Sequence, residues 1–193
     1  MKIVVIKYNA GNIGSVSNAL DRLGLECEVT DDPLTIRQAD KVIFPGVGEA
    51  STTMRYLRES GLDKVIPDLK QPVLGICLGM QLMCKWSEEG DTPALGIFPQ
   101  KVELFRGSVK VPHMGWNSIS FKQDGIFKDI DSGCYVYFVH SYFVEDGVST
   151  LATCDYGIRF SAALHRDNFY AVQFHPEKSG EVGQQILKNF IDL

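Results

Sequence analysis

The chain has 193 residues, of which 45% are hydrophobic and 22% charged, a balance typical of one globular domain with a sizeable core. The formal net charge of -5 argues against a nucleic-acid partner, and no segment has the roughly 20 apolar residues that span a bilayer. We therefore expect one cytoplasmic domain over residues 1–193 that acts with small molecules and other proteins.

The first half of the chain alternates short β-branched runs with longer helical patterns, which is typical of a parallel sheet flanked by helices. Strands are predicted at residues 3–6, 25–29, 41–44 and 73–76. Apolar residues at helical spacing predict helices around residues 13–23, 54–57 and, after a break at Gly61, 62–69. The predicted fold class is α/β, a single domain with a central, mostly parallel sheet.

After about Gly96 the pattern changes to closely spaced strand-like runs separated by turn residues. These runs predict antiparallel strands in the C-terminal half, which either extend the same sheet or form a second one. A terminal helix is expected at residues 183–193, with Val182, Ile186, Phe190 and Leu193 on one face. The predicted antiparallel strands are residues 101–105, 109–111, 116–121, 134–139, 150–154, 160–164 and 169–174.

Cys77 lies between a predicted strand and a predicted helix, in the sequence Gly75-Ile76-Cys77-Leu78-Gly79. This is a G-x-C-x-G version of the nucleophile elbow, a turn so tight that only small residues fit at Gly75 and Gly79. The start of the helix favours an anionic sulfur, and the backbone N–H of Leu78 becomes a candidate oxyanion donor. A buried cysteine in a plain turn is the alternative, so the motif needs a base.

His175 and Glu177 supply a candidate base and the group that orients it. They follow the strand-like run 170–174, and Pro176 is expected to hold the chain extended between them, so that both side chains lie on one face. A carboxylate beside an imidazole stabilises the imidazolium, while the other ring nitrogen takes the proton from Cys77. An exposed pair at a strand end is the alternative, but the cysteine elbow in the same domain favours a catalytic role for the two residues.

A second candidate for the oxyanion hole is Pro45-Gly46-Val47-Gly48, at the end of the predicted strand 41–44. Its glycines allow a peptide to turn an N–H toward an oxyanion, and a flip of that peptide switches the donor on or off. The alternative is a plain β-to-α turn. His113, His140 and His165 lack metal-ligand spacing, and no nucleotide-binding glycine loop is present, so neither a metal nor a cofactor is predicted.

At this point the sequence resembles the class I, triad-type glutamine amidotransferases and, within them, the glutaminase subunits of imidazole glycerol phosphate synthases. The resemblance covers essentially the whole chain, with one departure at Lys7, where the family often has an acidic residue. The motifs that carry it are Gly75-Ile76-Cys77-Leu78-Gly79-Met80-Gln81, Phe174-His175-Pro176-Glu177-Lys178, Ala10-Gly11-Asn12, Pro45-Gly46-Val47-Gly48, Pro112-His113-Met114-Gly115-Trp116-Asn117 and Phe138-Val139-His140-Ser141-Tyr142.

The resemblance implies roles for these residues. Cys77, His175 and Glu177 would form the catalytic triad, and Gln81 with His140, Ser141 and Tyr142 would hold the substrate, L-glutamine. A surface position for Gln81 and a core position for Trp116 are the alternatives. The contacts implied for the partner subunit involve Asn12, Trp116, Tyr137 and Lys178.

The resemblance also implies a heterodimer with a cyclase subunit, a (β/α)₈ barrel that uses the ammonia in histidine biosynthesis. Glutaminase activity would then stay low until the partner's substrate binds. Three other hypotheses remain open from the sequence: a glutaminase that feeds another synthase such as one for surface amino sugars, a non-catalytic partner-binding module, and a general thiol hydrolase.

Overall fold

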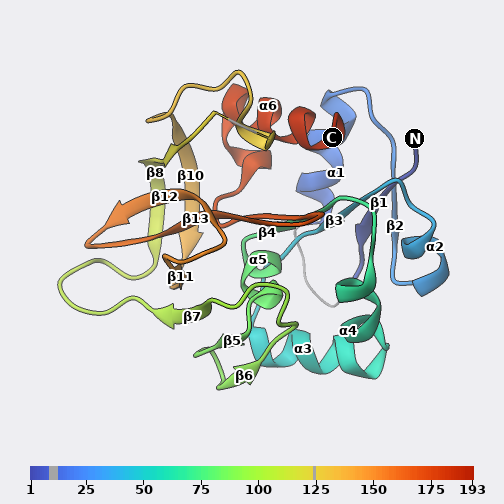
Figure 1. Cartoon of the computed structure of the whole chain (residues 1–193), viewed down its shortest axis with the longest axis horizontal. Helices are drawn as coiled ribbons and strands as arrows, with labels where there is room; N and C mark the ends of the chain where they lie inside the picture. Colours follow the sequence, from blue (N-terminus) through green and yellow to red (C-terminus); the bar gives the residue numbers. More distant parts are fainter. Residues whose placement is uncertain (9–12, 124) are drawn as a thin grey trace.

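A computed structural model describes residues 1–8, 13–123 and 125–193. The elements of the first half, with η for 3₁₀ helices, are β1 (Ile3–Ile6), α1 (Ile13–Arg22), β2 (Cys27–Thr30), α2 (Pro33–Arg37), β3 (Lys41–Phe44), α3 (Ala50–Glu59), α4 (Leu62–Val65), η1 (Ile66–Asp68), β4 (Val73–Ile76) and α5 (Leu78–Met83). The strands are parallel in the order β2-β1-β3-β4 (Figure 1). Every residue of β1, β3 and β4 is buried, as expected for continuous apolar runs in a sheet covered on both faces.

The second half is mostly antiparallel and continues the same sheet. Its elements are β5 (Trp86–Ser87), β6 (Thr92–Pro93), β7 (Lys101–Leu104), β8 (His113–Ser118), β9 (Ser120–Phe121), η2 (Gly125–Phe127), β10 (Tyr135–His140), β11 (Tyr142–Glu145), β12 (Thr150–Tyr156), β13 (Ile158–Arg166), β14 (Phe169–Val172), η3 (Pro176–Lys178) and α6 (Gly180–Ile191). Strand β14 joins the two halves, because it is parallel to β4 and antiparallel to β13. The order then runs β13-β11-β7-β5-β6, while β8 and β10 pair with each other in a separate sheet.

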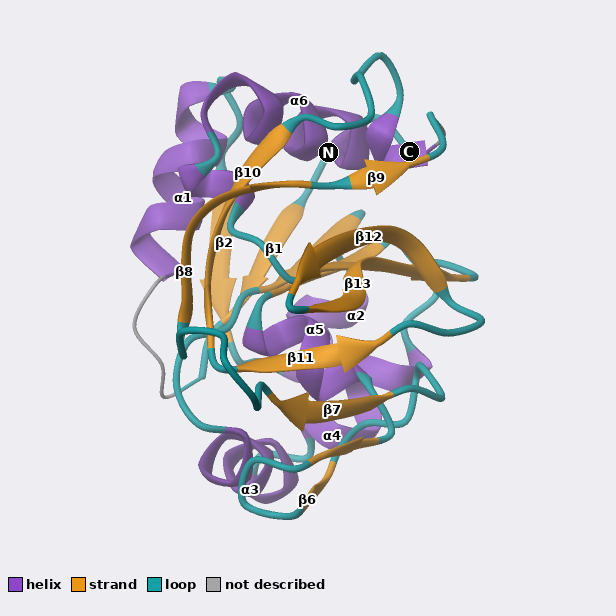
Figure 2. Ribbon diagram, turned by 90° about the vertical axis from the view of Figure 1, so that its left-hand side faces the viewer, coloured by secondary structure: helices purple, strands orange, loops and turns teal. Residues whose placement is uncertain are grey.

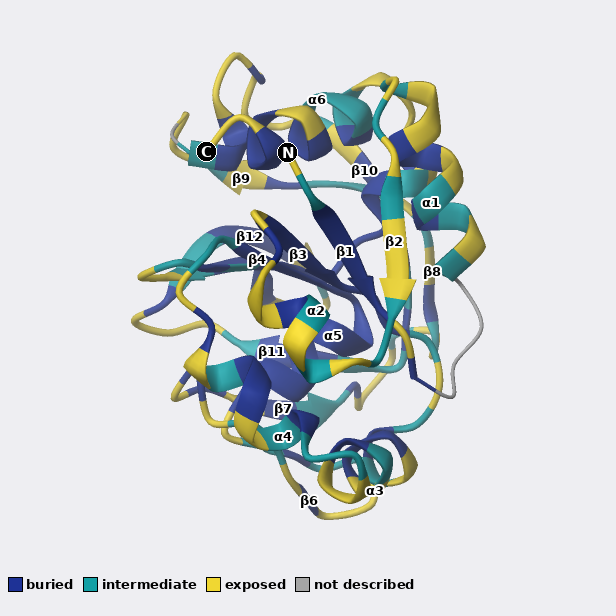
Figure 3. Ribbon diagram, turned by 90° about the vertical axis from the view of Figure 1, so that its right-hand side faces the viewer, coloured by how far each residue is buried: buried dark blue, intermediate teal, exposed yellow. Residues whose placement is uncertain are grey.

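The sheet separates two hydrophobic cores, because successive side chains of a strand point to opposite faces. In β1, Ile3 and Val5 belong to one core and Val4 and Ile6 to the other. Helices α1 and α6 cover the first core, and α2 to α5 cover the second (Figure 2). Figure 3 shows the buried strand β1 in the centre and the largely exposed strand β2 at the edge. Across the described ranges, no helix is long and apolar enough to cross a membrane.

The predicted fold class is confirmed, and both predicted outcomes for the antiparallel strands occur, since some extend the sheet and others form a second one. Three local predictions are wrong. Residues 109–111 form bends rather than a strand, and the run 116–121 is divided between β8 and β9 at Ile119. Leu193 lies beyond α6 and is 46% exposed, because the helix ends before its apolar face reaches that residue. Strand β11 was not predicted.

Candidate active site

Cys77 lies in a sharp turn between β4 and α5. Its φ of 53° and ψ of -108° are strained for a residue with a side chain, and such strain persists only where the surrounding structure fixes it. A Cβ on Gly79 would lie 2.0 Å from the Phe44 carbonyl oxygen, and one on Gly75 would lie 2.6 Å from the Met83 sulfur. The predicted need for small residues on both sides of the cysteine is therefore confirmed.

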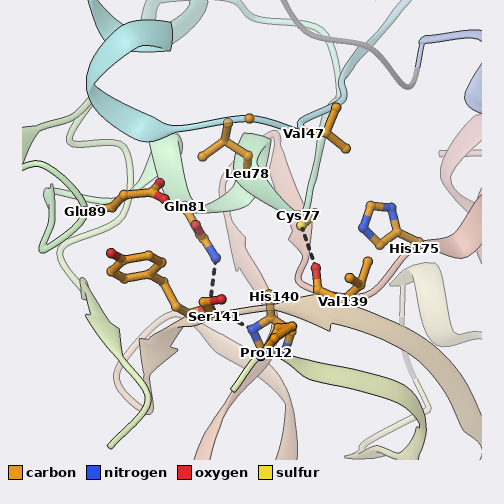
Figure 4. Close-up of a pocket in the computed structure, with 12 residues that line it drawn as sticks. Val47, Cys77, Leu78, Gln81, Glu89, Pro112, Val139, His140, Ser141 and His175 are labelled. Carbon is orange, nitrogen blue, oxygen red and sulfur yellow. Dashed lines mark hydrogen bonds between the residues drawn. The ribbon is translucent and has the colours of Figure 1, made fainter. Parts of the chain in front are cut away.

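The turn opens into a cavity of about 370 Å³. Figure 4 shows His175 on one side of the Cys77 sulfur, with Gln81 and Glu89 toward the other end of the cavity. Gly46 is not among the lining residues, because it packs against Leu78 and Gly79 at the start of α5. The residues that line the cavity are Val47, Gly48, Cys77, Leu78, Gln81, Glu89, Pro112, Val139, His140, Ser141, Tyr142 and His175.

His175 and Glu177 form a buried pair. The Nδ1 of His175 lies 2.7 Å from Oε1 of Glu177, and the two side chains are 1% and 0% exposed. The expectation of an extended chain through Glu177 is wrong: His175 is extended, but residues 176–178 form the 3₁₀ turn η3, which brings the carboxylate back to the ring. The backbone N–H of His175 donates to the carbonyl of Tyr137 at 2.9 Å, so β10 holds the ring in place.

The charges around His175 suit a proton acceptor. Burial by itself lowers the pKa of His175, but its interactions with Cys77 and Glu177 outweigh burial and raise the pKa to about 10. Because Glu177 occupies Nδ1, the ring presents Nε2 to the thiol. Within the described residues that nitrogen is buried and has no full hydrogen bond. The site can therefore move a proton between a sulfur and an imidazole.

Two glutamines connect the cavity wall to the sulfur. Gln81 is 4% exposed and its Nε2 donates to the Tyr142 carbonyl at 2.9 Å and to Oε1 of Gln173 at 3.0 Å. The alternative of a surface residue at position 81 is therefore wrong. Gln173 was not predicted, although a carboxamide in the otherwise apolar run 170–174 was a usable signal. Its Nε2 lies 3.7 Å from the Cys77 sulfur.

Glu89 is a second lining residue that was not predicted, because the acidic sequence around it is typical of an exposed surface loop. Burial raises the pKa of Glu89, the backbone N–H of Ala50 opposes that rise through a 2.8 Å hydrogen bond, and the charge of Glu49 adds to it. The carboxylate lies at the far end of the cavity from His175 (Figure 4). An acidic group there suits a ligand that carries an ammonium group.

The remaining predicted substrate residues lie at the start of β11 and the end of β10. Ser141, Tyr142 and His140 all line the cavity, and His140 is 6% exposed, with its Nδ1 2.7 Å from the Tyr142 carbonyl oxygen. His140 also contacts His113 on the neighbouring strand β8. Among the residues that the structure describes, no group of three or more His, Cys, Asp or Glu side chains is arranged to hold a metal ion.

The predicted partner contacts lie on the surface near η3 and the β8–β10 sheet. Trp116 is 56% exposed, so the alternative of a core position is wrong. It pairs directly with Tyr137 across the two strands, and their rings meet edge to face at 6.1 Å. Lys178 is exposed next to Glu177. Asn12 lies outside the described residues.

Comparisons with known proteins identify the family. A model of the class-I glutamine amidotransferase family matches residues 4–193. The imidazole glycerol phosphate synthase subunit HisH of Bacteroides fragilis strain YCH46 is 60% identical over 196 residues, covering 100% of this chain and 100% of the relative. Subunit HisH of Mannheimia succiniciproducens is 45% identical over 192 residues, covering 98% of this chain and 99% of the relative.

Solved structures show the same fold. A putative GMP synthase subunit from Thermoplasma acidophilum has a TM-score of 0.77 and 23% identity, covering 100% of this chain and 93% of that one. A glutamine amidotransferase has a TM-score of 0.75 and 20% identity, covering 98% of this chain and 97% of that one. At these identities the likeness concerns the fold alone.

Proposed function

The chain belongs to the class-I glutamine amidotransferase family, and from that premise we propose that it is the glutaminase subunit of an imidazole glycerol phosphate synthase. It hydrolyses L-glutamine to glutamate and ammonia and passes the ammonia to a synthase subunit. The observation that carries this proposal is that Cys77 and His175 line one cavity, with the buried carboxylate of Glu177 held against Nδ1 of His175. The full-length likeness to HisH subunits supports the choice of synthase.

The reaction begins when the Cys77 sulfur attacks the carboxamide carbon of glutamine. His175 takes the thiol proton at Nε2, and Glu177 stabilises the imidazolium through its 2.7 Å contact with Nδ1. The interactions that raise the pKa of His175 make the ring a good acceptor for this proton. The new carbon–sulfur bond forms as the carbonyl π electrons move to oxygen, which becomes an oxyanion.

The oxyanion requires N–H donors from the backbone. The N–H of Leu78 is one candidate, and a peptide N–H of residues 46–48 is the other, since Val47 and Gly48 line the cavity beside the sulfur. Removing one such donor costs about 3 kcal/mol of transition-state stabilisation. A peptide flip in this glycine-containing turn therefore serves as the switch that keeps activity low until the partner is ready.

Collapse of the tetrahedral intermediate releases ammonia. His175 returns its proton to the leaving nitrogen as the carbon–nitrogen bond breaks, which leaves a thioester on Cys77. A water molecule then attacks the thioester, with His175 again taking the proton, and the thiol leaves to give glutamate. No cofactor takes part in these steps.

The cavity fits the two ends of glutamine. The reacting carboxamide lies at the Cys77 end, and the carboxylate of Glu89 at the other end would bind the α-ammonium group. Gln81, His140, Ser141 and Tyr142 form the walls between them. This arrangement favours a free amino acid over a peptide, whose α-nitrogen carries no charge.

The ammonia acceptor is proposed to be a cyclase subunit with a (β/α)₈ barrel, which forms a heterodimer with this chain in the cytoplasm. Its docking surface would include Trp116, Tyr137 and Lys178, which lie on the surface near the His175 turn. Asn12, outside the described residues, stays a predicted partner contact. Exposed aromatic side chains such as Trp116 are common anchors in protein interfaces.

The proposal is tested by measuring glutamate release by the chain alone and with the cyclase and its ligand. We expect strong stimulation in the complex, and we expect Cys77→Ala to abolish glutamine-dependent synthase activity while turnover on added ammonium continues. Unchanged glutamine use by the variant would refute the assignment of the nucleophile.

The rival hypotheses give different results in the same assay. A general thiol hydrolase would turn over peptide or ester substrates without any partner, and a binding module would support the synthase without releasing glutamate. A glutaminase for another acceptor would release glutamate but would leave growth without histidine intact after deletion of its coding sequence.

A further inference from the structure

Four buried polar side chains connect the β8–β10 sheet with the nucleophile, two of them from that sheet itself. Gln81 is 4% exposed, His113 3%, His140 6% and Gln173 0%. Burying a polar group is costly unless it has hydrogen-bond partners. These four provide partners for one another and for the Tyr142 carbonyl, so they form a connected network.

The first branch of the network runs from the Tyr142 carbonyl through His140 to His113. Its hydrogen-bond direction is fixed at this carbonyl, which only accepts hydrogen bonds. Nδ1 of His140 lies 2.7 Å from this oxygen and must therefore carry the proton. Nε2 of the neutral ring then accepts from Nδ1 of His113, at 3.1 Å. Both rings are thus assigned the tautomer with the proton on Nδ1.

The outer end of this branch is fixed by Asn117. Its Oδ1 accepts from the backbone N–H of Ser118 at 2.8 Å and its Nδ2 donates to the Asp155 carbonyl at 3.1 Å, which sets the orientation of the amide. The same Nδ2 faces Nε2 of His113 at 3.4 Å, the nitrogen that is left as an acceptor. The orientation of the Asn117 amide, which places a donor opposite Nε2 of His113, therefore supports the assigned tautomer.

The two rings are held rigidly and are uncharged near neutral pH. The ring of His113 stacks on Phe138 and on Tyr156, with centroid distances of 4.8 and 3.9 Å. Burial lowers the pKa of His113 to about 4 and, against the hydrogen bond to the Tyr142 carbonyl, that of His140 to about 3. Neither ring is available as an acid near neutral pH, so their contribution to the site is geometric.

The second branch runs from the same carbonyl to the sulfur. The Tyr142 oxygen also accepts from Nε2 of Gln81, whose other N–H donates to Oε1 of Gln173. Because Gln173 accepts there through its oxygen, its amide N–H groups face Cys77, with Nε2 3.7 Å from the sulfur. Gln81, with both N–H groups engaged, presents its oxygen as an acceptor.

We infer that this chain of hydrogen bonds sets the nucleophile for the proposed glutaminase reaction, with Gln173 as a catalytic residue that donates to the Cys77 sulfur and His113 and His140 as positioning residues. The histidine pair holds the Tyr142 carbonyl, the carbonyl orients Gln81, and Gln81 orients Gln173. The inference rests on the proposed function only for its effect on turnover, because the hydrogen-bond directions and the donor at the sulfur exist without any substrate.

The first test is the tautomer of the two rings in the free subunit. Nitrogen NMR of a histidine-labelled sample should show the proton on Nδ1 and a bare Nε2 for both His113 and His140, with no change of charge near neutral pH. A proton on Nε2 of either ring would overturn the chain, whatever the protein proves to catalyse.

The second test is the rate at which iodoacetamide alkylates Cys77 in the free subunit, followed by mass spectrometry of the Cys77 peptide. Gln173→Leu removes the donor and should slow alkylation about tenfold, the loss expected for a hydrogen bond to a charged atom. Gln173→Glu keeps an acceptor for Gln81 but cannot donate to the sulfur, and should slow it at least as much.

The matched control is Gln100→Leu, which removes another buried carboxamide, 3% exposed, between β6 and β7. It should leave the alkylation rate unchanged. An unchanged rate in both Gln173 variants, or equal slowing in the Gln100 variant, would refute the role of Gln173.

The third test separates positioning from packing at His113. His113→Phe fills the stack between Phe138 and Tyr156 but has no donor for His140, whereas His113→Asn keeps an N–H near the position of Nδ1. In the complex, the Phe variant should raise the KM for glutamine about tenfold through the misoriented Gln81, and the Asn variant should recover most of that loss.

Equal KM values for the two His113 variants would mean that the ring only packs, and would refute its positioning role. A wild-type complex that releases no glutamate would contradict the proposed function instead. In that case the tautomer and alkylation results would still decide whether the hydrogen-bond chain exists.

Discussion

The parallel half of the sheet relies on close backbone packing to position Cys77 and Gln81, whereas the antiparallel half relies on hydrogen-bonded side chains. Strands β3 and β4 end in the turn 45–48 and in the elbow of Cys77, where glycines let two loops pack directly on each other. The end of β10 contributes His140, and the segments that follow β10 and β14 contribute Ser141, His175 and Glu177, held by hydrogen bonds. The two packed loops should therefore tolerate no added Cβ at Gly46 or Gly79. The side-chain half should keep its fold but lose activity when a functional group is exchanged.

The largest effect is expected on the side-chain half, from His175→Asn. Asparagine can still donate to Glu177, which keeps the buried carboxylate paired, but it cannot carry the proton of Cys77. Glutamine-dependent turnover of the complex should fall by about 10³-fold, or about 4 kcal/mol of barrier, while ammonium-dependent turnover and the melting temperature stay close to those of the wild type. Glutamine turnover within about tenfold of the wild type would contradict the assignment of the base.

The next effect is expected on the backbone half, from Gly46→Ala. The added Cβ would lie 2.3 Å from the backbone nitrogen of Gly79 and 2.5 Å from Cβ of Leu78, so the two loops must move apart. We expect a loss of about 3 kcal/mol in the free energy of unfolding, measured by urea denaturation.

The control for Gly46→Ala is Gly14→Ala in α1, where no atom of the described residues lies within 4 Å of the new Cβ. That variant should be neutral or more stable by about 0.5 kcal/mol, because alanine favours a helix. Equal stability of the two alanine variants would show that the loops are not tightly packed.

The difference between the parallel and antiparallel halves also explains which features could be predicted from the sequence. The bounds of β1, β3 and β4 were predicted to the residue, because buried parallel strands are apolar runs, and these three end before Lys7, Pro45 and Cys77. The elbow was also predictable, since its requirement for glycine is local. Cys77 and the turn 45–48 could thus be located from the residues that surround them in the chain.

The antiparallel half was harder to predict, because its strands find partners far away in the sequence. Residues 109–111 look like a strand but pair with no strand in the part of the chain that the structure describes. The loop is held instead by Tyr156, whose hydroxyl donates to the Lys110 carbonyl at 2.8 Å. Gln173 and Glu89 were missed for the same reason, since their roles depend on Cys77 and Ala50, which come from other parts of the chain.

A smaller effect is expected from Glu89→Gln, which removes a charge from the cavity without changing the shape of the side chain. The KM for glutamine should rise about 30-fold, or about 2 kcal/mol, because the α-ammonium group loses its partner, and kcat should change little. Glu88→Gln is the control, because Glu88 pairs with Arg106 instead of lining the cavity. An equal rise in KM for both variants would point to a general loss of negative charge.

The smallest effect is expected in the pH dependence of the free energy of unfolding. A change in the side-chain half should alter the slope of this dependence, whereas a change in the backbone half should not. Burial lowers the pKa of His113 to about 4 and that of His140 to about 3, below the value of about 6.5 in the unfolded chain. Between these values the unfolded state binds more protons, so the free energy of unfolding falls as the pH drops below about 6.5.

Replacing His113 by Asn should therefore make this fall shallower by about 1 kcal/mol between about pH 7 and about pH 5.5, measured by urea denaturation at each pH. Gly46→Ala, which changes only packing, should lower the whole curve without changing its slope. Both variants keep the carboxylates of the wild type, so their titration cancels in the comparison. A His113→Asn curve parallel to that of the wild type would show that the buried histidines do not set the acid sensitivity, and the division between a backbone half and a side-chain half would then apply to catalysis but not to stability.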